Sequence, residues 1–368
     1  MAQTLTVRSP LELEQLINRH LFLRSANNIR IECPASYLKA ANVQGLLKKH
    51  PIGNRAWFSY DPERRELKLF AMSRPLHDTV TSLFSAFMAS AVSSNFIPHQ
   101  LRNKILINPH GSIMMRSREL QSGSKVESWT KYPDLAITYR GEHRTPVVVC
   151  ESGFSESYDD LKNEAVQWLV RSGGQVQLVL LVDIKEDGKG KVSCQKTPAA
   201  QQRLRQLIRT FGTHHVKTMA GFHGSDSGSS SSTANVSELG DDDDSDTSDP
   251  DMYNAVRNGI MVSDWVGPLT VTAELWELRG GVPAVRTTTR ILPTPQAQTS
   301  LLIKLRDLIP PNHLQEIDGL DVDAGHPLDL DIFRELLQEG SQDLAFERAI
   351  RYLRHKPDPV DASYNPED

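Results

Sequence analysis

The chain has 368 residues, of which 39% are hydrophobic and 24% are charged, and its formal net charge is −5 at pH 7. This length suits one large domain or two moderate ones, and the modest hydrophobic content predicts an ordered core with polar appendages. No apolar run approaches the roughly 18 residues of a membrane helix, so we expect no membrane partner. The N-terminus lacks a signal-peptide pattern, and the three cysteines form no CxxC pair. An intracellular compartment, nuclear or cytoplasmic, therefore fits best.

The charge is distributed unevenly along the chain. Residues 224–251 contain nine acidic residues and no Lys or Arg, and residues 301–368 contain fifteen acidic and seven basic residues. The remainder has 34 basic and 22 acidic residues, a net charge of +12. Such a basic core suits a polyanionic ligand such as nucleic acid, which acidic appendages mimic or repel. Appendages that only aid solubility explain the distribution equally well.

The N-terminal third of the chain predicts helices, a hairpin and short strands. Apolar residues at helical spacing follow Pro10, and Trp57–Tyr60 and Glu66–Phe70 flank an Asp-Pro turn. The clearest helix is Leu76–Ser93, with Ser73 as its N-cap. The other predicted elements are a strand at Asn28–Glu32, a helix near Tyr37–Lys49, strands at Ile105–Ile107 and Ser112–Met115, and a polar loop at Arg118–Lys131.

The most informative stretch is Pro133–Asp183, which predicts strand, turn, strand, helix and strand in that order. Its first two strands are the apolar runs Asp134–Tyr139 and Pro146–Glu151, joined by a six-residue connection. The first strand begins with a carboxylate, Asp134, and the second strand ends with another, Glu151. A helix with an apolar stripe follows at Tyr158–Arg171.

The composition changes sharply after this stretch. Residues 221–257 are rich in Gly, Ser and Asp and cannot bury a core, so we expect a disordered acidic insertion there. An α/β domain is predicted for residues 1–220 with 258–295, and an acidic helical extension for residues 296–368. Their remaining elements are a turn at Gly188 and Gly190, a basic helix at Pro198–Phe211, a hairpin of Leu269–Leu278 with Val282–Leu292, and helices at Thr299–Leu308 and Leu330–Arg354.

A candidate site follows from pairing the two strands of the central stretch as an antiparallel hairpin. If Tyr139 faces Pro146, every opposed pair of residue numbers adds up to 285, and Asp134 faces Glu151. Directly opposed residues share one face of a sheet, with Cβ atoms about 5 Å apart, and like charges there are unfavourable without a cation. Carboxylates are natural Mg²⁺ ligands. Alternatively, Asp134 is a turn residue and Glu151 an N-terminal charge for the following helix.

The Pro-Asp at a strand start, followed by a hydrophobic strand ending in Glu, a helix and another strand, resembles the PD-(D/E)XK nuclease superfamily. The resemblance covers roughly residues 55–185, and the Glu-Ser-Gly-Phe-Ser segment is most similar to the Uma-type restriction-endonuclease-like branch and to fungal proteins. It implies an α-β-β-β-α-β core with a mixed sheet, here with an N-terminal helical and hairpin extension. It also implies that Asp134 and Glu151 bind Mg²⁺ or Mn²⁺.

The family lysine is missing from its usual place. It belongs two residues after the Glu, a position held here by Gly153. Some members supply it from the neighbouring helix, which makes Lys162 the candidate for positioning the attacking water. Lys162 as an ordinary surface lysine remains open, and Lys131 is a weaker candidate. His77, in the first turn of its helix, is either a capping residue or a neighbour of the metal.

Three functional hypotheses follow. The leading one is a metal-dependent endonuclease acting on DNA, in which Asp134, Glu151 and Lys162 are catalytic. The second is an inactive nucleic-acid-binding protein that keeps the fold, which the missing lysine at Gly153 favours. The third is a protein-interaction module, whose partner binds the acidic insertion or the C-terminal helices.

Overall fold

A computed structural model describes residues 4–22, 29–43, 46, 57–61, 64–70, 75–108, 113–116, 128–141, 144–154, 157–212, 250–293, 300–317 and 319–354. The chain divides into two compact units. The first comprises Met1–Glu186 and Leu269–Gly340, and the second comprises Asp187–Pro268 and Ser341–Asp368. The predicted insertion at 221–257 falls within the second unit, and residues 213–249 lie outside the described residues.

The first unit is built around a six-stranded mixed sheet, which confirms the α/β class. Its middle strands pair in parallel, whereas all other neighbours are antiparallel. Strand β10 (Leu178–Glu186), which pairs in parallel with β9 (Arg144–Phe154), begins Leu-Val-Leu-Leu-Val. These five residues are buried on both faces of the sheet, as is typical of a parallel strand. In sheet order the strands are β12 (Val282–Leu292), β11 (Leu269–Arg279), β10 (Leu178–Glu186), β9 (Arg144–Phe154), β8 (Leu135–Arg140) and β5 (Ile105–Asn108).

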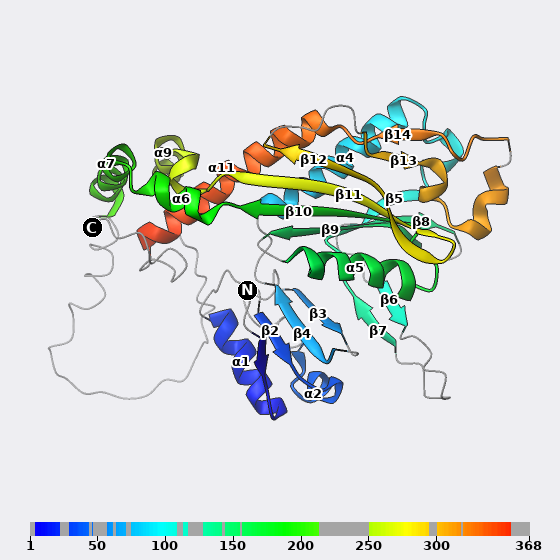
Figure 1. The fold of residues 1–368 in the computed structure, drawn as a ribbon, viewed down its shortest axis with the longest axis horizontal. Coiled ribbons are helices and arrows are strands. Elements are labelled where there is room, and N and C mark those ends of the chain that lie inside the picture. The colour runs from blue at the N-terminus through cyan, green and yellow to red at the C-terminus, as the bar shows by residue number, and fades with distance from the viewer. Residues whose placement is uncertain are drawn as a thin grey trace, which may run out of the picture. The chain divides into compact units, whose positions relative to one another are not determined.

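Two helices pack against β9. Helix α4 (Pro75–Ser93) precedes β5 in the chain, and α5 (Tyr158–Arg171) connects β9 to β10 (Figure 1). The Ser157 hydroxyl accepts the Asp160 N–H and so caps α5, as its sequence favours. Leu161, Ala165 and Trp168 form the buried stripe of α5 over β9, β10 and β11. The chain order is therefore α4-β5-β8-β9-α5-β10, with the ribbon of β6 (Ile113–Arg116) and β7 (Ser128–Lys131) inserted before β8.

The N-terminal part of the first unit has its own small sheet, in the order β1-β2-β4-β3. Ionic and polar pairs join this sheet to α5. Arg30 donates two hydrogen bonds to Asp160, and Lys68 donates one to Glu164. The elements are β1 (Thr4–Thr6), α1 (Pro10–Phe22), β2 (Ile29–Glu32), α2 (Ala35–Ala40), β3 (Trp57–Asp61) and β4 (Glu66–Phe70).

The predicted hairpin of β11 and β12 is confirmed, with Gly280 and Gly281 at positive φ in its turn. After it, the predicted helix at Thr299–Leu308 is wrong, because a strand and a short 3-10 helix occupy its described part. The predicted loop at Arg118–Lys131 ends in β7. The remaining elements are η2 (His99–Leu101), β13 (Leu302–Lys304), η4 (Leu305–Leu308), η5 (Pro311–Ile317), β14 (Gly325–Pro327) and α11 (Leu330–Arg354).

The second unit is helical in its described residues. The predicted turn at Gly188 and Gly190 is wrong: both lie in a helix, which the Asp187 carboxylate caps by accepting the Lys189 N–H. A helix also covers 250–257, the last part of the segment predicted to be disordered. The elements are α6 (Gly188–Gln195), α7 (Pro198–Leu207), the π-helical segment η3 (Ile208–Gly212), α9 (Pro250–Gly259) and α10 (Val262–Trp265). Within the described ranges of the chain, no helix is long and apolar enough to span a membrane.

Candidate functional site

The candidate site lies where β8 and β9 meet. Leu135 faces Cys150 and Ile137 faces Val148, so the predicted register holds at this end of the pair. A bulge after Ile137 shifts the other end, where Tyr139 faces Thr145 instead of Pro146. Asp134 directly precedes β8 and Glu151 follows Cys150 in β9. The fold therefore brings these two residues to the same end of neighbouring strands.

The Asp134 carboxylate is bound to Ser152 and to a histidine of α4. Its Oδ2 accepts the Ser152 N–H at 2.7 Å and the Ser152 hydroxyl at 2.8 Å. The His77 Nδ1 lies 3.4 Å from the same oxygen and 2.9 Å from the Ser152 Oγ. Because the hydroxyl donates its single proton to Asp134, it accepts from His77, which places a proton on Nδ1. His77 thus contacts Asp134, the residue for which the sequence predicts a metal.

These contacts keep Asp134 ionised. Burial raises the pKa of its carboxyl, but the hydrogen bond and charge of His77 and both hydrogen bonds from Ser152 outweigh it, so the pKa lies below its ordinary value. The side chain is 36% exposed. Asp134 therefore presents a charged oxygen donor that a ligand can reach.

Glu151 has the opposite environment. The residue is 5% exposed, and its Oε1 accepts the indole N–H of Trp168 from α5. Burial, followed by the charges of Asp134 and Glu164, raises the pKa of Glu151 well above its ordinary value, although Lys131 and Trp168 act against this rise. The Glu151 carboxyl therefore keeps its proton to a higher pH than an ordinary carboxyl does.

The hydrogen bonds of the two carboxylates go to opposite faces of the sheet. Neighbouring strand residues point to opposite sides, and Glu151 reaches α5 while Ser152 reaches α4. Asp134 stands outside the regular pairing and binds Ser152, so its contacts lie with the α4 side. Its charge nevertheless raises the pKa of Glu151, which shows that the two groups interact electrostatically.

Lys131, at the end of β7, is a buried cation beside Trp168 and Glu164. It is 2% exposed, and its Nζ lies 4.7 Å from the ring centroid of Trp168 and 3.9 Å from Glu164 Oε1. Among the described residues this buried ammonium has no hydrogen-bond partner. From the sequence, Lys131 was a weaker candidate than Lys162 for the family lysine, because a single lysine before Tyr-Pro gives no indication of burial.

The structure places Lys162 elsewhere. The residue is exposed on α5, and its Nζ lies 5.9 Å from the ring centroid of Trp276. In the described part of the chain it forms neither an ion pair nor a hydrogen bond with Asp134 or Glu151. Gly153 continues β9 and supplies no side chain. The lysine that approaches the site is therefore Lys131.

Three further residues of the site were not predicted: Ser152, Glu164 and Trp168. Glu164 had a readable signal, because it lies three residues after Leu161 and four before Trp168 and so falls within the apolar stripe of α5. Burial raises its pKa, but the charges of Lys131 and Lys68 and the hydrogen bond from Lys68 lower it overall. Cys150 is buried beside the site with a raised thiol pKa, as expected of a core cysteine.

The donor set fits a hydrated divalent ion only in part. Mg²⁺ typically binds one or two carboxylates and keeps several waters, and Asp134 meets this requirement as an ionised, accessible oxygen donor. Glu151 would have to lose its proton and has one oxygen occupied by the Trp168 indole. No group of three or more His, Cys, Asp or Glu suited to a metal occurs among the described residues.

Comparisons of the chain with protein-family models, with curated proteins and with solved structures gave no match. The function must therefore be inferred from the chemistry of the site residues themselves.

Proposed function

We propose that the first unit is a PD-(D/E)XK-like domain that acts on a phosphodiester with the help of Mg²⁺ or Mn²⁺. One observation supports this most directly. The chain order α4-β5-β8-β9-α5-β10 brings Asp134 and Glu151 to the same end of neighbouring strands. This is the arrangement that the resemblance implies for its two metal-binding carboxylates.

The residues of the site have distinct roles in this proposal. Asp134 is the primary ligand because it is ionised and accessible. Glu151 would be the second ligand, and to bind the same ion as Asp134 it would have to lose its proton and leave the Trp168 indole on the α5 side. A bound divalent ion would activate water and stabilise the negative charge that develops on the phosphodiester.

Lys131 takes the role of the family lysine in place of Lys162. It lies beside Trp168 and Glu164, and its charge lowers the pKa of Glu151. His77 is a positioning residue, because its Nδ1–H fixes the Ser152 hydroxyl that in turn donates to Asp134.

A second candidate function is an inactive module that keeps the fold and binds nucleic acid or a protein. The hydrogen bond from the Trp168 indole to Glu151 favours it, because this bond and burial give the carboxyl a partner without any metal. The inactive module predicts that Glu151 serves stability alone.

Incubation of the purified full chain with single- and double-stranded DNA, in the presence of Mg²⁺ or Mn²⁺, tests the first function. We expect cleavage by the wild type and its loss in Asp134→Asn. Asp183→Asn provides a matched control, because this carboxylate also lies in a central strand but pairs with Lys185. Cleavage that survives in Asp134→Asn would remove the assigned site.

Measurements of Mn²⁺ binding and nucleic-acid binding distinguish the metal-dependent nuclease from the inactive module. Mn²⁺ titrated into the wild type and into Asp134→Asn should bind only to the wild type if the site holds a metal. If neither protein binds Mn²⁺ or cleaves DNA, the inactive module is favoured. Its nucleic-acid affinity should then fall steeply with added salt, since the charge of the basic core is the source of binding.

A further inference from the structure

A cleft in the first unit lies far from the candidate site. It has a volume of about 460 Å³ and is formed by the residues just before β10, the β11–β12 hairpin and the segment around η4 and η5. This volume falls within the range of small-molecule sites, about 300–1,000 Å³. The cleft is lined by three arginines and by two carboxylates.

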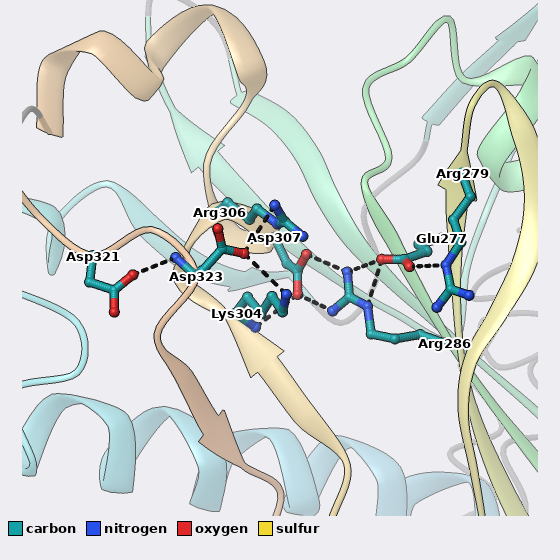
Figure 2. Close-up of polar contacts among 8 residues, drawn as sticks. All are labelled: Glu277, Arg279, Arg286, Lys304, Arg306, Asp307, Asp321 and Asp323. Carbon is teal, nitrogen blue, oxygen red and sulfur yellow. Dashed lines mark hydrogen bonds and ion pairs between the residues drawn. The ribbon is translucent and has the colours of Figure 1, made fainter.

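Arg286 lines this cleft and is held between Glu277 and Asp307 (Figure 2). Its Nε donates to Glu277 at 2.6 Å, and its two terminal nitrogens donate to the Asp307 carboxylate at 2.6 and 2.8 Å. The side chain is 12% exposed. Two carboxylates around one guanidinium fix its orientation, so Arg286 shapes the cleft and keeps few donors for a ligand.

Arg279 and Arg306 differ from Arg286 in keeping donors available. Arg279 uses its Nε to bond Glu277 at 2.7 Å, and Arg306 uses one terminal nitrogen to pair with Asp323 at 3.0 Å. Their side chains are 57% and 43% exposed. Each therefore has N–H groups left that can face a ligand in the cleft, in the planar arrangement that matches a phosphate.

The charge and the apolar surface of the cleft define the ligand. Three arginines and two carboxylates, Glu277 and Asp307, line the cleft, and a third carboxylate, Asp323, pairs with Arg306 from outside the lining. The rest of the lining is the amide of Gln177 and five apolar residues, of which Leu278, Pro311 and Leu314 are at least partly exposed and Val176 and Ile309 are buried. We propose that this cleft binds a small organic phosphate, with Arg279 and Arg306 holding the phosphate and the apolar residues contacting the organic group.

The cleft is separate from the Asp134 site. Gln177 lines the cleft, whereas Val182 faces Ser152 five residues further along the chain. At about 3.3 Å per strand residue, the two places are about 17 Å apart. The proposal therefore does not depend on the metal or on the phosphodiesterase activity.

Calorimetric titration of the full chain at low salt, with EDTA present, tests this site. The probes are phenyl phosphate, inorganic phosphate, benzoate and phenol. We expect phenyl phosphate to bind most tightly, inorganic phosphate more weakly and phenol not at all. In the double variant Arg279→Gln/Arg306→Gln, which leaves Arg286 intact, the affinity for phenyl phosphate should fall at least tenfold.

Arg257→Gln is the matched control, since this arginine is also exposed and paired with one carboxylate but lies outside the cleft. Its affinity for phenyl phosphate should equal that of the wild type, and circular dichroism should show that all variants are folded. Equal binding of phenyl phosphate by the double variant and the wild type would overturn the proposal. Tighter binding of benzoate, or equal binding of phenol, would overturn the assignment of a phosphate.

Discussion

Two charged clusters of the first unit differ in how their charges are compensated. We call one the Arg286 network (Arg286, Glu277 and Asp307) and the other the Glu151 cluster (Glu151, Glu164, Lys131, Lys68 and Trp168). In the network, one guanidinium donates to two carboxylates and satisfies both. In the cluster, the Lys131 ammonium has no hydrogen-bond partner within the described parts of the chain, and it interacts with a carboxyl whose pKa is raised well above its ordinary value.

This difference distinguishes charges that stabilise the fold from charges that are available to a ligand. Buried ions stabilise a structure only when their hydrogen bonds are satisfied, and the Arg286 network meets that condition. Perturbed and incompletely paired groups are typical of functional sites, where the protein holds charges in place for a ligand. The Glu151 cluster is therefore the better candidate for chemistry, and the Arg286 network for architecture.

Arg286→Ala should have the largest effect on stability. It leaves Glu277 and the buried Asp307 without their shared cation, and removing one partner of a buried pair typically costs about 3–5 kcal/mol. Urea unfolding followed by circular dichroism measures the loss. Arg257→Ala removes an exposed pair and should cost less than about 1 kcal/mol. Equal losses in both variants would contradict the architectural role.

Trp168→Phe should cost less than Arg286→Ala. It removes the indole donor of Glu151 while keeping an aromatic ring, and an unsatisfied buried acceptor costs about 1–3 kcal/mol. The loss should be smaller when the same change is made in a Glu151→Met protein, because that side chain has no carboxyl left to lose its donor. If the two backgrounds lose equal amounts, the hydrogen bond has no part in the effect.

Glu151→Gln should change how stability depends on pH. Above the ordinary pKa of 4.5, the folded chain holds a proton on Glu151 that the unfolded chain has released. Wild-type stability should therefore fall with rising pH, by about 1.4 kcal/mol per pH unit from this group, until the raised pKa is reached. Glutamine has no such proton, so the variant should gain stability relative to the wild type as the pH rises above the ordinary pKa of 4.5. Parallel stability curves would show that Glu151 is not protonated.

Lys131→Met should have the smallest effect on stability. The Nζ loses no hydrogen bond within the described structure, Lys68 still neutralises Glu164, and a buried ion replaced by an apolar side chain is often nearly neutral. We expect a change of less than about 1 kcal/mol in urea unfolding. If the wild type cleaves DNA, the variant should lose cleavage while keeping its fold. A loss above about 3 kcal/mol would place Lys131 with the structural charges instead.

The central part of the fold was readable from the sequence. The strands β8 and β9 are buried apolar runs, α5 has a clear stripe and a serine cap, and the register at Leu135 and Cys150 follows from a simple hairpin. The bulge after Ile137 left no signal, since the extra residue, Val147, is one more apolar residue inside an apolar strand.

Other features depended on tertiary context. Gly188 and Gly190 suggested a turn, but the Asp187 cap begins a helix there. A Cβ atom at Gly190 would lie 2.7 Å from the Asp187 carboxylate and 3.0 Å from Pro268, so a side chain there would displace these neighbours. The charged site residues were predicted in part: Asp134 and Glu151 from their strands, and His77 from its helix. Burial of Lys131 could not be predicted, because it results from the β6–β7 ribbon packing against α5.

The pairing of β10 with β11 has a consequence for how the chain folds. Glu186 faces Leu269, and the next residues continue the contact, since the Asp187 N–H donates to the Pro268 carbonyl at 2.9 Å. The whole segment between them must be looped out before these two strands meet, and such long-range closure slows folding. Replacing residues 188–267 by a two-residue turn would convert the pairing into a local hairpin, which forms within about 1–10 μs.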